Sequence, residues 1–574
     1  MTTDNASTDY RRRFDAALDL HRQGLTGQCL LALEDLLRQR PDDLSLRYCF
    51  GAIAVQAGDP VAALPHLETV LAAHSNHIDA AEALARAYVE TDQAARAVSL
   101  WRRFLARSPG LRAHVRLLEA LLAGGQADLA REEASSLEQH SLGAAPRLAI
   151  GTVFHEAGLV EEATGWYRRA LKDDPVNRHA REHLAAAEYA LGRIDEARVL
   201  YERLARDFPG DAAIWQALGS LYKEQDDLAG GMTCYQRAMR IKRRMPEADE
   251  LPLLARDPAQ RRTSIHSLKL ELEQLEALRD ANVRVRGLGS LIDGYTEILD
   301  ELRLGPTGEH KRTLTEAQFM KIGRSMHRLV HHEPAERLDG GALNPDVDWR
   351  QVEADYQNAK PGLVVVDGFL REEAIEALRR YALRSTIWFD YSKAGGYCGS
   401  YLNDGFGCPL LMQLSEELRE RMPEVVGPYP LTHLWGYIYD ATLSGITSHA
   451  DPAKVNLNFW VTPDDANLDP DSGGLVVWTR EAPAEWNFQA YNNEPEAIDA
   501  FVADSHKVVV PHRRNRVVMF NSSLVHRTDD FRFRSGLMNR RLNMTMLFGH
   551  RSGPEAGGAP PLESAEARPQ SDQA

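Results

Sequence analysis

The chain has 574 residues, of which 44% are hydrophobic, and this length suits about two to four domains with packed cores. A net charge of −16 argues against the broad basic surface that is typical of nucleic-acid-binding proteins. No apolar run reaches the length of a membrane span, and the opening residues lack the pattern of a secretory signal. The five cysteines have no paired spacing, so we expect reduced thiols and a cytoplasmic location.

Residues 10–243 carry a repeat of 34 residues. Small residues recur at this spacing, and each is followed four positions later by a large side chain, as paired helices require when they stack on the next pair. The small positions are Ala63, Ala97, Ala163, Ala197 and Gly231, and the large ones are Leu67, Trp101, Tyr167, Tyr201 and Tyr235. In the last unit, Trp215, Leu218, Gly219 and Tyr222 have the spacing of the tetratricopeptide signature.

This region therefore resembles a tetratricopeptide repeat array, which implies an all-α solenoid of about six or seven helix pairs. We expect Gly219 to lie where two helices touch. Arrays of this family bind peptides or proteins in a concave groove, so the resemblance implies a protein or peptide partner. The groove candidates are His155, Tyr189, Ser220 and Lys223, although each alone also fits an ordinary solvated helix face.

Residues 244–360 are predicted to be a helical linker region between two domains. Apolar spacing predicts helix over 262–303 and again over 314–332, followed by an irregular linker over 333–348. Three histidines, His327, His331 and His332, lie close together in the sequence, and we interpret them as a solvated helix end rather than as a metal site. At the other end of the chain, residues 552–574 have the composition of a disordered tail.

Towards the C-terminus the pattern changes to short strands. Alternating side chains predict strands over 432–439, 455–461 and 541–548, a glycine turn leads into a strand over 475–478, and another strand is predicted over 516–521. In the last of them, one face carries Arg541, Asn543 and Thr545, and the other carries Leu542, Met544 and Met546. Short strands separated by turns predict an antiparallel jelly roll. The expected fold class is thus multidomain α + β, with a solenoid, a helical linker and a jelly roll with flanking helices.

A possible metal site lies among these strands, at His449, Asp451 and His526. His449 and Asp451 are separated by one residue, so both point to the same side of an extended chain. Two imidazoles and one carboxylate form a facial ligand set for Fe(II) that leaves positions open for a chelating cosubstrate and O₂. His77-Ile78-Asp79 has the same H-x-D pattern, but it lies between helical repeats without a strand pattern around it. We interpret these residues as ordinary polar residues of the surface.

Residues 361–551 resemble an Fe(II)/2-oxoglutarate-dependent oxygenase of the double-stranded β-helix, prolyl-hydroxylase-like type. The matching segments are 361–370, 449–451, 473–475, 520–526 and 540–549. The resemblance implies that His449, Asp451 and His526 bind iron and carry the catalysis, and that Arg541 pairs with the C5 carboxylate of 2-oxoglutarate. It also implies that Asn543, Thr545, Tyr439 and Asn458 support or touch this cosubstrate. Residues 479–505 are an expected insertion relative to the family.

Arg540 competes with Arg541 for the cosubstrate role, because the family's arginine usually lies somewhat closer to the distal histidine. The shared parity with Asn543 and Thr545 favours Arg541.

The resemblance implies a dioxygenase that hydroxylates a protein side chain or a small molecule, with O₂ and 2-oxoglutarate as cosubstrates. A carboxylate at Asp451 favours hydroxylation over halogenation, since related halogenases have a small residue there. The competing interpretation is a tetratricopeptide scaffold in which the jelly roll is only structural. The sequence indicates neither the substrate nor the oligomeric state.

Overall fold

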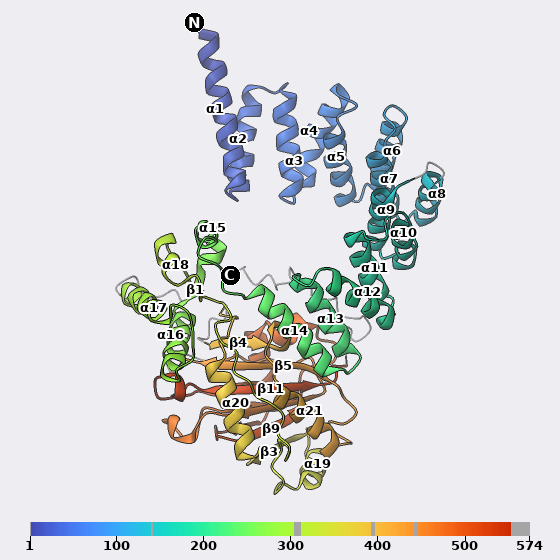
Figure 1. The fold of residues 1–574 in the computed structure, drawn as a ribbon. Coiled ribbons are helices and arrows are strands. Elements are labelled where there is room, and N and C mark those ends of the chain that lie inside the picture. The colour runs from blue at the N-terminus through green and yellow to red at the C-terminus, as the bar shows by residue number, and fades with distance from the viewer. Residues whose placement is uncertain (1, 139–141, 304–310, 392–396, 441–444, 553–574) are drawn as a thin grey trace. The chain divides into compact units, whose positions relative to one another are not determined.

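The computed structural model describes residues 2–138, 142–303, 311–391, 397–440 and 445–552 (Figure 1). They form two compact units, Met1–Leu200 and Tyr201–Ala574. The expected disordered tail lies outside the described residues from position 553 onward. In the described part, no helix combines the length and the apolar character that a membrane span requires.

The N-terminal part is a helical tetratricopeptide solenoid, as predicted. Its helices are α1 (Thr2–Arg22), α2 (Thr26–Gln39), α3 (Leu44–Gln56), α4 (Pro60–Ala73), α5 (Ile78–Glu90), α6 (Ala94–Leu105), α7 (Leu111–Ala123), α8 (Ala127–Glu138), α9 (Ala144–Glu156), α10 (Val160–Asp173), α11 (Arg178–Ala190), α12 (Ile194–Asp207), α13 (Ala212–Glu224) and α14 (Leu228–Lys242). They make seven consecutive pairs. Ala63, Ala97 and Ala163 are fully buried, because a small residue at this position lets neighbouring helices approach.

His77, the histidine of the second H-x-D, has a structural role. It is the residue before α5, and its Nδ1 accepts a hydrogen bond from the backbone N of Ala80 at 3.2 Å. A side-chain acceptor at this place satisfies one of the free N–H groups of the first helical turn. His77 was expected to be an ordinary polar residue of the surface, whereas the structure shows that it caps α5.

The expected groove residues are mostly engaged inside the fold. Tyr189 and Ser220 are buried, and the Ser220 hydroxyl lies 3.0 Å from the Tyr235 hydroxyl. Lys223 Nζ donates to the carbonyl oxygen of Thr432 at 3.3 Å. The prediction that Tyr189 and Ser220 face an open groove was therefore wrong. The spacing of these residues from the packing positions of their helices did not distinguish a face in the groove from a face that packs on the neighbouring helix pair.

Gly219 lies where α13 meets α14, as predicted. A Cβ atom at this position would be 2.8 Å from two ring carbons of Tyr235. We expect Gly219→Leu to lower the free energy of unfolding by ~1–3 kcal/mol through overpacking. Urea unfolding of the full-length chain measures this. Gly210→Leu is the matched control, because a Cβ at Gly210 would meet nothing within 4 Å. Equal losses in both variants would contradict the contact.

The last repeat pair belongs to the second compact unit. In that unit, Gln236 Nε2 donates to the carbonyl oxygen of Gly407 at 2.7 Å. Arg243 forms an ion pair with Asp404 at 3.2 Å, and Met239 lies so close to Gly405 that a Cβ there would clash with it. The compact unit therefore begins inside the repeats, at Tyr201, and not at the sequence boundary of residue 243.

The region after the repeats contains shorter helices than predicted. It consists of α15 (Leu251–Arg256), β1 (Arg262–Ser264), α16 (Ile265–Asp280), α17 (Leu288–Arg303), β2 (Lys311–Thr313), α18 (Glu316–Ile322) and α19 (Trp349–Asn358). The single helix expected over 262–303 is a strand and two helices. The helix expected over 314–332 ends at Ile322, and the chain then turns, with a positive φ of 55° at His327.

The three neighbouring histidines are not a solvated helix end. The ring of His327 is 9% exposed and stacks on Tyr391 at 4.2 Å between centroids. His332 meets the Tyr381 ring edge-on, and His331 Nε2 lies 3.0 Å from a Glu333 carboxylate oxygen. This interpretation was wrong because contacts distant in sequence bury the segment.

The segment expected to be a linker, 333–348, is packed as well. It has no helix or long strand, but Ala335, Ala342 and Leu343 are buried in the same core as α20 (Glu372–Arg384) and α21 (Pro409–Arg421). The segment was predicted to be a linker, and its burial in the core was not predicted.

Two antiparallel sheets form the centre of the second unit. The larger has the strand order β3-β9-β6-β11-β5-β4, and the smaller has the order β10-β7-β8. The strands are β3 (Leu363–Asp367), β4 (Tyr397–Tyr401), β5 (Leu431–Tyr439), β6 (Val455–Trp460), β7 (Leu475–Glu481), β8 (Lys507–Val510), β9 (Arg516–Asn521), β10 (Leu524–Thr528) and β11 (Leu542–Phe548). All strands predicted from alternation are present, and the multidomain α + β class is confirmed.

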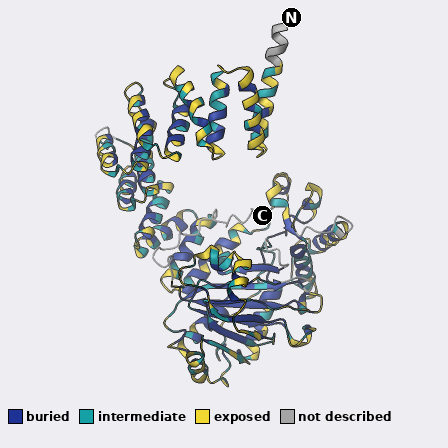
Figure 2. Ribbon diagram, turned by 180° about the vertical axis from the view of Figure 1, so that it is seen from behind, coloured by how far each residue is buried: buried dark blue, intermediate teal, exposed yellow. Residues whose placement is uncertain are grey.

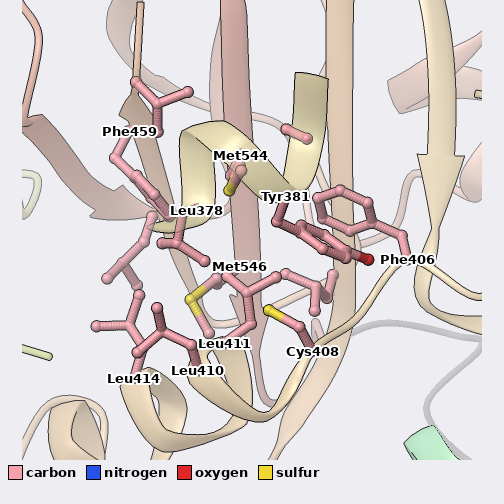
Figure 3. Close-up of a cluster of buried hydrophobic side chains, with 14 of the residues drawn as sticks. Leu378, Tyr381, Phe406, Cys408, Leu410, Leu411, Leu414, Phe459, Met544 and Met546 are labelled. Carbon is pink, nitrogen blue, oxygen red and sulfur yellow. The ribbon is translucent and has the colours of Figure 1, made fainter. Parts of the chain in front are cut away.

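The two faces of the larger sheet have different surroundings. One face carries Phe459, Met544 and Met546, which pack against α20 (Glu372–Arg384) and α21 (Pro409–Arg421) in the cluster of Figure 3. Trp460 and Phe520, on the opposite face, pack against apolar residues of the smaller sheet. Both faces are thus buried, as the dark strands of Figure 2 show. The face that carries Trp460 and Phe520 is called the inner face. Polar side chains on this inner face are therefore removed from water.

Helix α16 is fixed to the end of β5 through Asp440. The Asp440 carboxylate lies 3.2 Å from His266 Nδ1 and 3.5 Å from Lys269 Nζ. Burial alone would raise the pKa of Asp440, but the hydrogen bond from His266 and the charges of Arg540 and Lys269 outweigh it and hold this pKa well below its usual range. Asp440 is thus ionised at neutral pH.

Asp440→Asn should therefore destabilise the chain at pH 7, by ~1–3 kcal/mol, because a partly buried charged partner is lost. A carboxyl with a lowered folded pKa contributes its stability above its unfolded pKa of about 4, and this contribution is lost as pH falls towards the folded value. The difference between wild type and variant should consequently narrow from about pH 5 to about pH 3. Urea unfolding at several pH values checks this, and a difference independent of pH would contradict it.

Candidate metal centre

The two histidines of the predicted triad are held side by side by backbone hydrogen bonds. His526 lies on β10, and His449 lies in the irregular segment that leads to β6. His449 N donates to His526 O at 3.0 Å, and His526 N donates to His449 O at 2.8 Å. This isolated antiparallel bridge brings the ring centroids to 4.3 Å. The predicted strand over 516–521 ends before His526, and the structure places this residue in a further strand, β10.

Asp451 completes the group from the same side as His449. Its carboxylate oxygens lie 3.7 Å from His449 Nε2 and 3.3 Å from His526 Nε2. Ala450, between the two, faces the other way and is fully buried against Val476 and Tyr491. The candidate ligand atoms of the three residues all lie within 4.8 Å of one another. No second cluster of three such residues occurs in the described ranges.

The expected insertion supports this arrangement. After β7 the chain forms α22 (Phe488–Asn492) and α23 (Pro495–Val502) before it returns in β8. The backbone N of Ala450 donates to the carbonyl oxygen of Tyr491 at 2.8 Å. The segment that carries His449 and Asp451 is therefore held from both sides, by β10 and by α22.

The hydrogen bonds of the two rings determine which nitrogen is available. His449 Nδ1 lies 2.8 Å from the carbonyl oxygen of Thr447, and His526 Nδ1 lies 3.0 Å from that of Leu524. A carbonyl oxygen only accepts, so each Nδ1 carries the proton and donates it. Each Nε2 then offers a lone pair towards Asp451, as metal-binding histidines do.

Asp451 and His526 are 4% and 3% exposed, so this is a nearly dry site. Burial would raise the pKa of Asp451, but a hydrogen bond from His526 Nε2 and the positive charge of both imidazoles, which exist when the rings are protonated, outweigh it and lower this pKa. The residue is therefore a carboxylate at neutral pH, which is the form that binds a cation.

Arg541 is a buried cation near the start of β11. It is 1% exposed, and its guanidinium donates to the carbonyl oxygens of Gly473 at 2.7 Å and Gly474 at 3.0 Å. Its Cζ lies 4.6 Å from the centroid of the Tyr439 ring. Within the described ranges, no carboxylate lies at ion-pair distance from Arg541. Burial lowers the pKa of Arg541, although Tyr439 and the more distant Asp529 oppose this, and a buried cation without an ion-pair partner favours an anionic ligand.

Arg540 has a different environment. Its Nε donates to Glu273 of α16 at 2.6 Å, and the side chain is 5% exposed. The two neighbouring arginines therefore leave the backbone in different directions, one to an acid on a helix and one to the glycine turn before β7.

The other expected cosubstrate residues lie together on the inner face. Thr545 Oγ1 donates to Asn458 Oδ1 at 2.6 Å, and Asn543 lies 3.4 Å from Arg541 Nη1. The burial of Tyr439 raises its pKa, although the neighbouring Arg541 opposes this, so its hydroxyl keeps its proton.

Three residues of this site were missed or misinterpreted from the sequence. Asn456 was not named as a site residue, yet it is fully buried and its Nδ2 donates to Asp451 Oδ2 at 2.6 Å. Trp460 Nε1 and both ring nitrogens of His512 are buried and have no hydrogen-bond partner among the described residues. The Trp460 ring lies 6.0 Å from Arg541 Cζ and 5.8 Å from the His512 ring.

The parity of Trp460 with Asn456 and Asn458 was a usable signal, whereas His512 had none. Burial lowers the pKa of His512 to about 3, and the charge of Arg541 acts in the same direction, so this ring is neutral.

The N-terminal part of the chain contains tetratricopeptide repeats, and the tetratricopeptide repeat family matches residues 54–110 and 154–221. A tetratricopeptide repeat protein from Parabacteroides merdae ATCC 43184 aligns at 17% identity and a TM-score of 0.31, over 41% of this chain and 93% of its own. A thermophilic protein of the same class from Thermus thermophilus aligns at 19% identity and a TM-score of 0.24, over 31% of this chain and 98% of its own. A search among curated proteins gave no match.

Proposed function

We propose that the second unit is an Fe(II)- and 2-oxoglutarate-dependent dioxygenase that hydroxylates its substrate. The observations that carry this proposal are the convergence of His449, Asp451 and His526 and the burial of Arg541, which has no ion-pair partner among the described residues. The triad suits a metal and the arginine suits a carboxylate, and 2-oxoglutarate is a ligand that can bind both.

The donor set fits Fe(II). Two neutral imidazoles and one carboxylate match the 2-His-1-carboxylate ligand set of non-haem iron oxygenases, which leaves positions for a cosubstrate and O₂. When bound, iron supplies the oxidising chemistry that couples decarboxylation of 2-oxoglutarate to substrate hydroxylation, with succinate and CO₂ as products. The carbonyl partners of His449 and His526 fix the ring orientation, and the low exposure of Asp451 limits water at the site.

The cosubstrate residues follow from the same geometry. Arg541 offers a planar fork of donors that suits the distal carboxylate of 2-oxoglutarate, and its two backbone contacts hold it in place. Trp460 Nε1 and His512 are further buried polar groups beside it that a bound anion can satisfy. Tyr439, Asn458, Asn543 and Thr545 line the same face and orient the ligand.

The tetratricopeptide repeats give the protein a partner-binding part, for which we propose a peptide or protein substrate. The alternative is a non-enzymatic scaffold, which the repeats alone would also support. Free cysteines and an Fe(II) site both suit a reducing compartment, so we propose a cytoplasmic location.

Succinate formation by the purified chain tests the enzyme against the scaffold. We expect succinate from 2-oxoglutarate that depends on Fe(II) and O₂ and that a chelator abolishes. A chain that binds neither Mn(II), as an air-stable substitute for Fe(II), nor 2-oxoglutarate would favour the scaffold.

A further inference from the structure

A row of buried side-chain amides leads from Arg541 to the candidate metal ligand Asp451. The amide row consists of Asn456 and Asn458 on β6 and Asn543 on β11, which are 0%, 5% and 5% exposed. β6 and β11 are paired neighbours in the larger sheet, so these side chains share its inner face. Such burial is costly for an amide unless its donors and acceptors are satisfied.

Within the row, the donor of each hydrogen bond lies on the side of Arg541 and the acceptor lies on the side of Asp451. Asn456 Nδ2 donates to Asp451 Oδ2 at 2.6 Å, and Asn458 Nδ2 donates to Asn456 Oδ1 at 2.6 Å. Asn458 Oδ1 accepts from Asn543 Nδ2 at 3.3 Å and from Thr545 Oγ1 at 2.6 Å. Arg541 Nη1 lies 3.4 Å from Asn543 Oδ1, at the far end.

The two ends determine this order. A carboxylate such as Asp451 only accepts, and a guanidinium such as Arg541 only donates. If the Asn458 amide were reversed, its oxygen would face the Asn456 oxygen and its nitrogen would face the Asn543 nitrogen. Both contacts would be repulsive, so the amide row has one favoured orientation. The hydrogen bond from Asn456 that orients the Asp451 carboxylate therefore depends on residues, such as Asn458, that do not touch Asp451.

We propose that Asn456 and Asn458 are positioning residues that hold Asp451 in its metal-binding orientation, with Asn458 acting through Asn456. This inference rests on the proposed function, because it assigns the amide row to the metal site of the dioxygenase. Residues that orient metal ligands typically change metal affinity by roughly 10–100-fold when they are replaced.

Calorimetric titration with Mn(II) tests this without turnover and without 2-oxoglutarate. Asn456→Leu should weaken Mn(II) binding roughly 10-fold or more. Asn458→Leu should also weaken it several-fold, although Asn458 does not contact Asp451 in the structure. Since the two amides act in series, the double variant should be no weaker than Asn456→Leu alone.

Thr462→Val controls for the general loss of a buried hydrogen bond. Thr462 is 2% exposed, donates to the carbonyl oxygen of Arg540 at 2.8 Å and accepts from the backbone N of Leu542 at 2.9 Å, outside the amide row. Its replacement should lower the free energy of unfolding but leave Mn(II) affinity unchanged. If Asn458 had only a structural role, Asn458→Leu would likewise lower stability without changing Mn(II) affinity.

The outcomes separate the inference from the function on which it rests. If Asn458→Leu leaves Mn(II) affinity unchanged, the inference is wrong. It is also wrong if the losses of Mn(II) affinity in the two single variants multiply in the double variant. In both cases a wild type that binds Mn(II) still supports the proposed function. A folded wild type that binds no Mn(II) would overturn both. If a leucine variant fails to fold, Asn456→Ala and Asn458→Ala remove the same donors with less bulk, and the same comparison decides.

Discussion

Asp451→Ala should abolish metal-dependent succinate formation and weaken Mn(II) binding by more than ~100-fold. The estimate follows because loss of a ligand must exceed the 10–100-fold effect of residues that only orient ligands. Asp451 is the sole carboxylate in the group, and two imidazoles alone do not form the facial set. Metal titration and succinate assays measure the effect, and near-ultraviolet circular dichroism checks the fold.

His77→Ala is the matched control for this prediction. His77 precedes Asp79 in the same H-x-D spelling, but its ring caps α5. We expect unchanged Mn(II) affinity and a loss of stability of ~1 kcal/mol at most, as for a helix cap. A folded Asp451→Ala variant that binds Mn(II) like wild type would remove Asp451 from the ligand set.

The sequence was informative where side-chain periodicity and local geometry agree. The alternation in 541–548 predicted β11 and the two faces on which Met544 and Asn543 lie. The single residue between His449 and Asp451 predicted that both side chains share a side, and Ala450 indeed faces the other way. The 34-residue period predicted the solenoid for the same reason, since each helix pair repeats one local pattern.

The sequence was uninformative where distant contacts determine the structure. Residues 333–348 have no periodicity, yet Leu343 packs into the core because α20 and α21 cover it. Asn456 was not recognised as a site residue because its acceptor, Asp451, becomes a neighbour only after the turn before β6 closes. His512 had no signal at all, since its burial beside Trp460 depends on the approach of two sheets.

Because Arg541 and Arg540 have different environments, their replacement by lysine should affect the 2-oxoglutarate requirement differently. Arg541→Lys should raise the 2-oxoglutarate concentration needed for half-maximal turnover by ~10–100-fold, which corresponds to the loss of about 1.5–3 kcal/mol from a charged hydrogen-bonded pair. An ammonium group lacks the planar fork that here also contacts the carbonyl oxygens of Gly473 and Gly474. Mn(II) affinity in the absence of 2-oxoglutarate should stay within a few-fold of wild type, because Arg541 touches none of the three ligands.

Arg540→Lys is the comparison that decides between the neighbours. Arg540 is buried and its guanidinium is paired with Glu273 at 2.6 Å. We expect a measurable loss of stability, because lysine does not reproduce the guanidinium hydrogen bond to Glu273. The 2-oxoglutarate requirement should be unchanged, because Arg540 does not contact the glycine turn that holds Arg541. Titration of both variants with 2-oxoglutarate separates the two effects. If Arg540→Lys raises the requirement and Arg541→Lys does not, the buried guanidinium beside Tyr439 is a structural cation, and the distal carboxylate binds on the α16 side of β11.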